Sequence, residues 1–226
     1  TSRVMVEGFL DGPQLSTESL VVGGQVFTVG IADRNYGRMQ DFSPFMIEDG
    51  GDTPALLTPS THSAVLSLVE RASSALGIQD GVVKGDLVLH DGEPHIIEGA
   101  ARLSGGYFCT HQIPLATGVD LVGAAIRLAL GQRPPSELLC PTKSAHVSQR
   151  FVFPKPGRVV RVSGVEEASA LDGVEMCEVR VSIGDVIETV ESHPMRAGVV
   201  IASGTSREQA RQRAEAAVKT LRVETR

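Results

Sequence analysis

The sequence is poor in cysteine, in long apolar runs and in excess positive charge. Its 226 residues include three cysteines, which are too far apart to predict a disulfide framework or a paired metal site. No apolar run approaches the roughly 18 residues that a membrane span requires, and the first residues lack the apolar core of a signal peptide. The net charge of -6 argues against a surface that binds nucleic acid. We therefore expect a soluble, cytoplasmic protein with reduced thiols and neither a nucleic-acid nor a membrane partner.

The sequence does contain enough apolar material for a substantial core. Hydrophobic residues make up 42% of the chain and charged residues 21%, which fits one large domain or two small ones. The first residue is Thr1 and not Met, and residues 3–7 already have the pattern of a strand. We therefore expect the chain to be a truncated piece of a longer protein.

Apolar periodicity predicts strands and helices in the first half of the chain. Alternation favours strands at 3–7, 16–22, 25–31, 82–90 and 94–98. Helical spacing predicts one helix capped by Ser60 and a second helix over 120–130. Residues 33–59 show no period and gather Gly, Asp and Pro, which predicts a long loop.

A proline-containing stretch, residues 132–136, predicts a linker, because two consecutive prolines exclude a continuing helix. We place a boundary there, with one unit at 1–133 and a second at 134–226. A final helix is expected after the capping residue Ser206. The second unit is expected to hold strands at 146–153, 158–162, 176–183, 186–190 and 198–203. The predicted fold class is α+β, a mostly antiparallel sheet with packed helices followed by a smaller α+β module.

Two carboxylates flank the hairpin that is expected around Asp91-Gly92, Asp86 before it and Glu98 after it. A two-residue turn would pair Asp86 with Ile97 and point the carboxylates to opposite faces, whereas a three-residue loop would put them on one face. Two oxygen ligands on one face suit Mg²⁺ completed by substrate phosphates better than they suit zinc. The metal hypothesis therefore requires an odd loop that contains Gly92.

An arginine and a glycine pair follow the second carboxylate. Arg102 lies four residues after Glu98, and its planar guanidinium suits the charge that develops in phosphoryl transfer. Gly105 and Gly106, together with Ser104, are candidates for contact with an anionic substrate, because glycine lets backbone amides approach closely. Acidic residues at strand ends are commonly only solvated, so these residues alone do not establish a metal site.

This pattern resembles the signature of the ATP-grasp superfamily: an acidic strand, a hairpin, a glutamate with an arginine four residues later, and a glycine turn. In this sequence the signature reads Lys84-Gly85-Asp86-Leu87 and Ile97-Glu98-Gly99-Ala100-Ala101-Arg102-Leu103-Ser104-Gly105-Gly106. Residues 6–13 are similar to the hinge strand that lines the adenine, and residues 113–120 to the helix entry that follows. The resemblance covers nearly the entire chain.

The resemblance implies the carboxyl-terminal half of an enzyme that uses ATP with Mg²⁺, or with Mn²⁺. It implies that Asp86 and Glu98 ligate the metal and that Arg102 steadies an acyl-phosphate transition state. Many members have Asn at the position of Ala100 and Glu at the position of Gln14, so one metal ligand and one ribose contact differ here. The implied adenine contacts are Glu7, Gly8, Phe9, Leu10, Val88 and Ile97.

The Ala-Ala-Arg form of the signature and residues 193–204 are most similar to the branch that ligates carboxylates to amines, such as amino-acid and dipeptide ligases. The resemblance implies an ATP-dependent C–N ligase that works through an acyl phosphate on small-molecule substrates and is inactive without an amino-terminal half. Two alternatives stay open: an enzyme of the biotin-carboxylase or carbamoyl-phosphate-synthetase type, and a non-catalytic nucleotide-binding or assembly module. A homodimer is also left open.

Other polar residues have ordinary explanations. Cys109 and His111 lie close together, but no third group is visible that would orient a base, so thiol catalysis is not expected. Asp33 and Arg34 fit a substrate contact and a solvated turn equally well. Glu18 fits equally a residue that supports a metal ligand and a surface charge.

Overall fold

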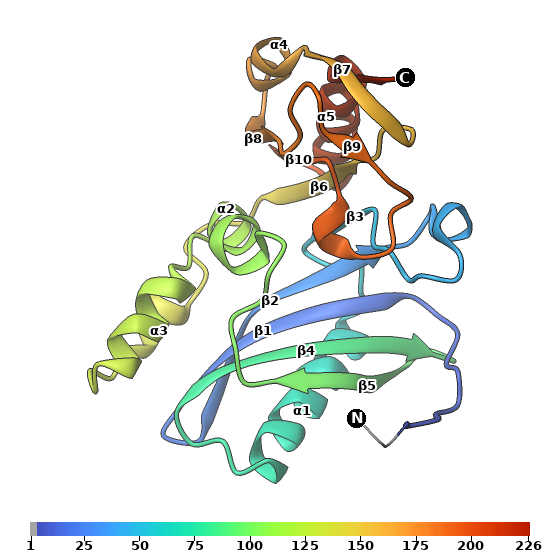
Figure 1. Ribbon diagram of the computed structural model, residues 1–226. Helices are drawn as coiled ribbons and strands as arrows, with labels where there is room; N and C mark the ends of the chain where they lie inside the picture. Colours follow the sequence, from blue (N-terminus) through green and yellow to red (C-terminus); the bar gives the residue numbers. More distant parts are fainter. Residues whose placement is uncertain (1–3) are drawn as a thin grey trace.

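The computed structural model describes residues 4–226, which fold around two antiparallel sheets (Figure 1). The large sheet has the strand order β5-β4-β1-β2-β3-β6-β10-β8, and the small sheet has the order β11-β7-β9. Every neighbouring pair of strands is antiparallel. The α+β class is therefore confirmed. No helix in the described part of the chain is long and apolar enough to cross a membrane.

The first hairpin joins β1 (Gln14–Val22) to β2 (Gln25–Asn35). Gly23 and Gly24 form its turn with φ of 58° and 82°, a conformation that favours glycine and matches the twist of the flanking strands. Both predicted strands are confirmed. The strand expected at 3–7 is wrong for residues 4–7, which form no regular secondary structure, and Arg3 lies outside the described residues.

The second hairpin joins β4 (Gly81–His90) to β5 (Glu93–Ala100) through a two-residue turn at Asp91 and Gly92. The expected odd loop is therefore wrong. The pairing nevertheless shifts by one residue between Asp86 and Leu87, because a β-bulge inserts an extra residue in β5. Leu87 pairs with Ile96 but Asp86 pairs with Glu98, so a bulge at Ile97 puts the carboxylates in register.

One face of the large sheet is covered by α1 (Pro59–Ala75). Val65 and Val69 of this helix pack against apolar side chains of β1, β2 and β4. The expected cap at Ser60 is wrong, because Thr58 is the N-cap and accepts a hydrogen bond from the Thr61 N–H at 3.1 Å. Proline at the first helical position fixes the helix start before Ser60.

The opposite face is covered by a π-helical turn at Phe108–Gln112, α2 (Ile113–Thr117) and α3 (Leu121–Ala129). Asp120 caps α3 as its side chain accepts from the Gly123 N–H at 2.9 Å, so the second predicted helix is confirmed. The turn at Phe108–Gln112 was not expected, whereas α2 lies within residues 113–120, which were likened to a helix entry. These segments bury an apolar cluster of Leu20, Ala32, Phe108, Ile113, Val119, Leu121 and Ala124.

A short strand within the predicted long loop joins the two halves of the large sheet. This strand, β3 (Gly50–Thr53), pairs with β2 on one side and with β6 (His146–Val152) on the other. A Cβ atom on Gly50 would lie 2.3 Å from the Gln149 carbonyl oxygen, so only glycine fits there. The loop prediction is thus wrong at 33–35 and 50–53, because periodicity cannot detect a four-residue strand that contains two glycines.

The carboxyl-terminal part completes both sheets. In the large sheet, β10 (Gly198–Gly204) lies between β6 and β8 (Val174–Val179), under α5 (Arg207–Thr220). Ser206 caps α5 as predicted, accepting from the Gln209 N–H at 3.2 Å. The expected strand at 186–190 shortens to β9 (Val186–Ile187). The remaining elements are β7 (Gly157–Ser163), α4 (Val165–Ser169), β11 (Arg222–Thr225) and 3-10 turns at Met39–Phe42, Ser136–Leu139 and His193–Met195.

The large sheet runs without a break across the boundary expected near residue 133, through the β3–β6 pairing. The division into units at 1–133 and 134–226 stays a prediction.

Candidate functional site

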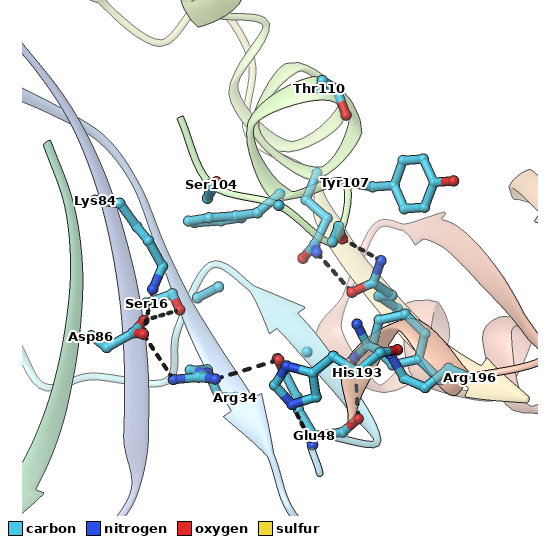
Figure 2. A pocket seen from close by; sticks show the side chains of 18 of the residues that line it. Ser16, Arg34, Glu48, Lys84, Asp86, Ser104, Tyr107, Thr110, His193 and Arg196 are labelled. Carbon is cyan, nitrogen blue, oxygen red and sulfur yellow. Dashed lines mark hydrogen bonds and ion pairs between the residues drawn. The ribbon is translucent and has the colours of Figure 1, made fainter. Parts of the chain in front are cut away.

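A cavity of about 660 Å³ lies between the large sheet and the segment that precedes α2, close to the β2–β3–β6 junction (Figure 2). It is lined by five cationic side chains, Arg34, Lys84, Arg102, Arg180 and Arg196. Three carboxylates also line it, Asp33, Glu48 and Asp86. The excess of positive charge suits an anionic ligand.

Asp86 stands at the centre of an ion cluster on the cavity wall (Figure 2). Ser16, across from it on β1, donates a hydrogen bond to Asp86 Oδ1 at 3.0 Å. Arg34 Nη1 lies 3.2 Å from Asp86 Oδ2, and Lys84 contacts the same oxygen. The Asp86 side chain is 13% exposed, so its charge is balanced mainly by these two cations.

Arg34 continues the cluster toward Glu48, whose Oε2 lies 3.7 Å from Arg34 Nη2. Burial acts to lower the pKa of Arg34, but Glu48, Tyr36 and Asp86 outweigh it and the pKa is raised. Burial raises the pKa of Glu48 against the opposing pull of Arg34 and Arg196. The sequence left both a substrate contact and a solvated turn open for Arg34. The solvated turn is wrong, because Arg34 lies in β2 and lines the cavity.

Arg196 and His193 form the far side of the cavity (Figure 2). Arg196 Nε donates to the His193 carbonyl oxygen at 2.8 Å, and its Nη1 donates to the Glu48 carbonyl oxygen at 3.3 Å. The guanidinium stacks 3.5 Å from the centre of the Phe151 ring. Burial lowers the pKa of Arg196 to about 10, so the group stays charged at neutral pH. Burial and the charge of Arg196 lower the pKa of His193.

Hydrogen bonds of two glutamine side chains hold the part of the cavity wall that the glycine turn forms. Gln112 accepts a hydrogen bond from Thr53 Oγ1 at 2.9 Å and donates to Gln149 Oε1 at 3.2 Å. Gln149 in turn donates to the Gly106 carbonyl oxygen at 2.7 Å. Tyr107 has a φ of 65°, in the left-handed region, and opens the π-helical turn. The glycine turn is thereby tied to β3 and β6, on the other half of the sheet.

Glu18 is a buried carboxylate beneath the glycine turn. It is 0% exposed, which excludes the surface reading, and both of its oxygens lie 3.2 Å from the Ser104 N–H. Burial raises the pKa of Glu18 to about 7, although Ser104 and two nearby cations act in the opposite direction. The Ser104 hydroxyl is buried and has no hydrogen-bond partner among the described residues.

Of the remaining predicted metal and phosphate residues, Arg102 and the glycine turn line the cavity, whereas Glu98 does not. Glu98 is 59% exposed and lies 4.0 Å from Arg102, which is 55% exposed and lines the cavity with Gly105 and Gly106. Among residues 4–226 no group of three or more His, Cys, Asp or Glu side chains has the arrangement of a metal site. Asp33 also lines the cavity but pairs with Arg207 at 2.6 Å, toward α5.

The structure separates the predicted adenine contacts into an exposed and a buried set. Phe9 is 76% exposed and Ile97 is 56% exposed, while Val88 is 2% exposed. Glu7 and Gly8 are exposed and Leu10 is half-buried. None of these residues lines the cavity.

Four cavity residues carry no signal that the sequence analysis used: Glu48, Tyr107, Gln149 and Arg180. Residues 193–204, which include His193 and Arg196, entered the sequence analysis only through the family resemblance. Glu48 precedes β3, Gln149 lies in β6 and Arg180 follows β8, and these strands pair across long sequence distances. Tyr107 reaches the cavity at the start of the π-helical turn.

These features define the class. The chain has the fold of the carboxyl-terminal subdomain of ATP-grasp enzymes, with an eight-stranded antiparallel sheet and helices on both faces. Residues 150–226 match the family model described as L-amino acid ligase C-terminal domain 2. The resemblance to ATP-grasp enzymes of the carboxylate–amine ligase branch is confirmed.

Two curated relatives match in sequence. The uncharacterized protein y4rH of Sinorhizobium fredii is 28% identical over 219 residues, which cover 97% of this chain and 44% of that protein. Carnosine synthase 1 of Homo sapiens is 28% identical over 133 residues, covering 59% of this chain and 16% of that protein.

Two solved structures illustrate the fold. The L-amino acid ligase from Bacillus licheniformis matches with a TM-score of 0.84 at 24% identity, over 96% of this chain and 53% of that one. A biotin carboxylase domain dimer from Hydrogenobacter thermophilus, solved with MgADP, ADP and bicarbonate, matches with a TM-score of 0.69 at 20% identity, over 94% of this chain and 46% of that one. The chain thus spans about half the length of these structures, and less than half of the curated relatives.

Proposed function

We propose that the chain is part of an ATP-dependent ligase that joins a carboxylate to an amine through an acyl phosphate. The observation that carries this proposal is the pairing of Asp86 with Glu98 beside a cavity lined by Arg34, Lys84 and Arg102. The family match of residues 150–226 supports the choice of an amino acid as substrate. We expect residues 1–226 alone to show no turnover, since the matched structures are about twice as long.

Magnesium fits the donor set if phosphate oxygens supply most of its ligands. Glu98 is exposed, and within residues 4–226 its one ion pair is the 4.0 Å contact with Arg102, so its carboxylate is accessible. Asp86 already pairs with Lys84 and Arg34 through Oδ2, so a metal ion would compete with these two cations for its carboxylate. Two protein carboxylates suit Mg²⁺ in a nucleotide site, where the ion supplies charge stabilisation for the transferred phosphoryl group.

The chemistry uses two displacements. A carboxylate oxygen of the substrate attacks the γ-phosphorus of ATP, an O–P bond forms, and the bond to the bridging oxygen breaks to release ADP. The amine nitrogen then attacks the acyl carbon, a C–N bond forms, phosphate leaves and the nitrogen loses a proton to solvent. Arg102 would stabilise charge on the phosphoryl oxygens, as would the amides of Gly105 and Gly106 with Ser104. A base stacked between Phe9 and Ile97 would use their exposed apolar surface, with Glu7, Gly8, Leu10 and Val88 as the further proposed adenine contacts.

The test measures ADP release by the full-length protein with ATP, Mg²⁺ and each of the common L-amino acids, alone and in pairs. Hydroxylamine, which converts an acyl phosphate to a hydroxamate, should trap the intermediate. Arg102→Ala should lower kcat about 100- to 1000-fold, as the loss of one transition-state donor does elsewhere. Arg161→Ala, another exposed arginine in an ion pair, is the matched control and should leave kcat unchanged.

Each alternative gives a different result in the same assay. ADP release that depends on bicarbonate and on no amino acid would support the biotin-carboxylase type and contradict the proposal. Equal turnover in wild type, Arg102→Ala and Glu98→Gln would support a non-catalytic site. A cytoplasmic location and a homodimer remain proposals that fractionation and sedimentation would test.

A further inference from the structure

One cation of the cavity differs from the others in lacking a carboxylate partner. Arg34 and Lys84 contact Asp86, Arg180 Nε lies 3.0 Å from Glu178, and Arg102 lies 4.0 Å from Glu98. Arg196 is 7% exposed, yet no carboxylate oxygen of residues 4–226 lies within 4.0 Å of its guanidinium nitrogens. A buried charge without a salt-bridge partner is costly, and an anionic ligand would reduce that cost.

The surroundings of Arg196 hold the guanidinium in place without neutralising it. Two backbone carbonyl oxygens, those of His193 and Glu48, accept from Nε and Nη1, and the Phe151 ring supports one face. In the described part of the chain, Nη2 makes no hydrogen bond. The Glu48 carboxylate pairs with Arg34 at 3.7 Å, and although its charge acts to raise the pKa of Arg196, it forms no salt bridge with Arg196 within 4.0 Å. A guanidinium fixed in this way is prepared for a carboxylate, because little side-chain freedom remains to be lost.

Arg196 also lines two cavities at once. Besides the main cavity of about 660 Å³, a second cavity of about 330 Å³ has Arg196, Arg180 and Pro194 in its wall. Val186, Ile187 and Met195 give this second cavity an apolar lining, with Asp185 and Glu188 as its acidic residues. Figure 2 shows Arg196 across the main cavity from Lys84 and Asp86. A ligand held by Arg196 would therefore lie apart from the Asp86 cluster and have room for a side chain.

We propose that Arg196 binds the carboxylate of the amine substrate, the carboxylate that is not phosphorylated, so that this substrate is an amino acid or a peptide. The inference rests on the proposed function and adds the residue that selects the amine substrate. A carboxylate in a charge-assisted pair with a guanidinium is a weaker nucleophile, because its negative charge is stabilised. Arg196 would thus also protect that carboxylate from phosphorylation. It would thereby determine which of the two substrates is activated and which one supplies the amine.

The test compares each amine substrate with its carboxamide, which differs only in lacking the carboxylate charge. In the full-length wild type, kcat/KM should favour the free acid by about 10- to 100-fold, the usual value of a hydrogen bond to a charged group. Arg196→Gln should abolish most of this preference by lowering kcat/KM for the acid while changing that for the amide less than about threefold. Arg196→Lys should retain part of the preference.

Arg180→Gln is the matched control, since Arg180 lines both cavities but is paired with Glu178. It should change acid and amide kinetics by the same factor. An equal loss for acid and amide in Arg196→Gln would show a merely structural role and overturn the assignment. So would a wild type without preference, or a preference removed by Arg180→Gln and kept by Arg196→Gln.

A binding measurement separates failure of this inference from failure of the proposed function. Calorimetric titration of the full-length protein with the twenty L-amino acids, and with carboxamides of those that bind, requires no turnover. Selective loss of acid binding in Arg196→Gln supports the site even where ADP release is absent. Failure of all twenty amino acids to bind the wild type would overturn it.

Discussion

Asp52 and Asp86 have the same kinds of partners, one serine hydroxyl and two cationic side chains, but differ in their access to the cavity. Asp52 accepts from Ser148 at 2.7 Å and pairs with Arg150 at 3.0 Å and Arg207 at 3.2 Å. Asp86 accepts from Ser16 and pairs with Arg34 and Lys84. Asp52 is 3% exposed within β3, at the junction of the two sheet halves, whereas Asp86 faces the cavity.

The two ion clusters thus differ in access and not in the kinds of partners, and we propose that access makes the Asp86 cluster the functional one. Burial acts to raise the pKa of Asp52, but Arg150, Ser148 and Asn35 outweigh it, so the pKa lies below the ordinary value. Asp52 thus joins β2, β3, β6 and the start of α5 through a carboxylate whose charged form is stabilised. The Asp86 carboxylate, with similar partners, faces the cavity and is accessible to a ligand there.

The largest expected effect in this comparison is the loss of the Asp52 charge. Asp52→Asn should reduce the free energy of unfolding by about 3–5 kcal/mol, because Arg150, whose side chain is 14% exposed, loses its close counter-ion and keeps a contact of 4.0 Å with Glu215. Arg207 retains its pair with Asp33 at 2.6 Å. Urea denaturation of the chain would measure this loss. Asp172→Asn removes an 88% exposed partner of Arg213 and should cost less than about 1 kcal/mol. Equal losses in the two variants would contradict the structural role of Asp52.

Glu18 sharpens the comparison, because it is buried and has no ion-pair partner in the part of the chain that the structure describes. Its folded-state pKa of about 7 exceeds the ordinary 4.5, so the folded state disfavours its charged form. This cost is absent below about pH 4.5, grows between 4.5 and 7, and is complete above 7. The free energy of unfolding of the wild type, relative to Glu18→Gln, should therefore fall by about 3 kcal/mol from pH 4.5 to pH 8.

Urea denaturation of the wild type and Glu18→Gln across this pH range would measure the difference. Glutamine keeps an oxygen that accepts from the Ser104 N–H, so the geometry of the glycine turn should persist. The exposed Glu167→Gln is the control and should show a difference that does not change with pH. A flat difference for Glu18→Gln as well would refute the raised pKa.

The smallest expected effect concerns Asp86 and appears mainly in activity. Asp86→Asn should lower ADP release by the full-length protein about 10- to 100-fold, since it removes the charge that orients Arg34 and Lys84. Its loss of unfolding free energy should be well below that of Asp52→Asn, because solvent in the cavity can hydrate the two cations. Full activity with a large stability loss would reverse the assignment of the two clusters.

The sequence predicted the strands with clear alternation and both capped helices, but not the segments that bring the cavity together. Capping chemistry identified α5 and helical spacing identified α3, while alternation identified β1, β2 and β4. It could not identify β3, whose Gly50-Gly51 has no apolar pattern and whose position depends on close contact with β6. The β-bulge at Ile97 was also hidden, because bulges depend on the partner strand and not on local propensity.

The pairing of Asp86 with Glu98 depends partly on the local sequence and partly on the tertiary structure. The sequence by itself determined the two carboxylates, the hairpin, the arginine and the glycine turn, since these follow from residue types and short-range spacing. Only the tertiary structure decided that a bulge and not the turn brings the carboxylates into register, and that Glu18 is buried. It also decided that Arg196 reaches the cavity, because strand pairing between distant segments is set by packing of the whole sheet.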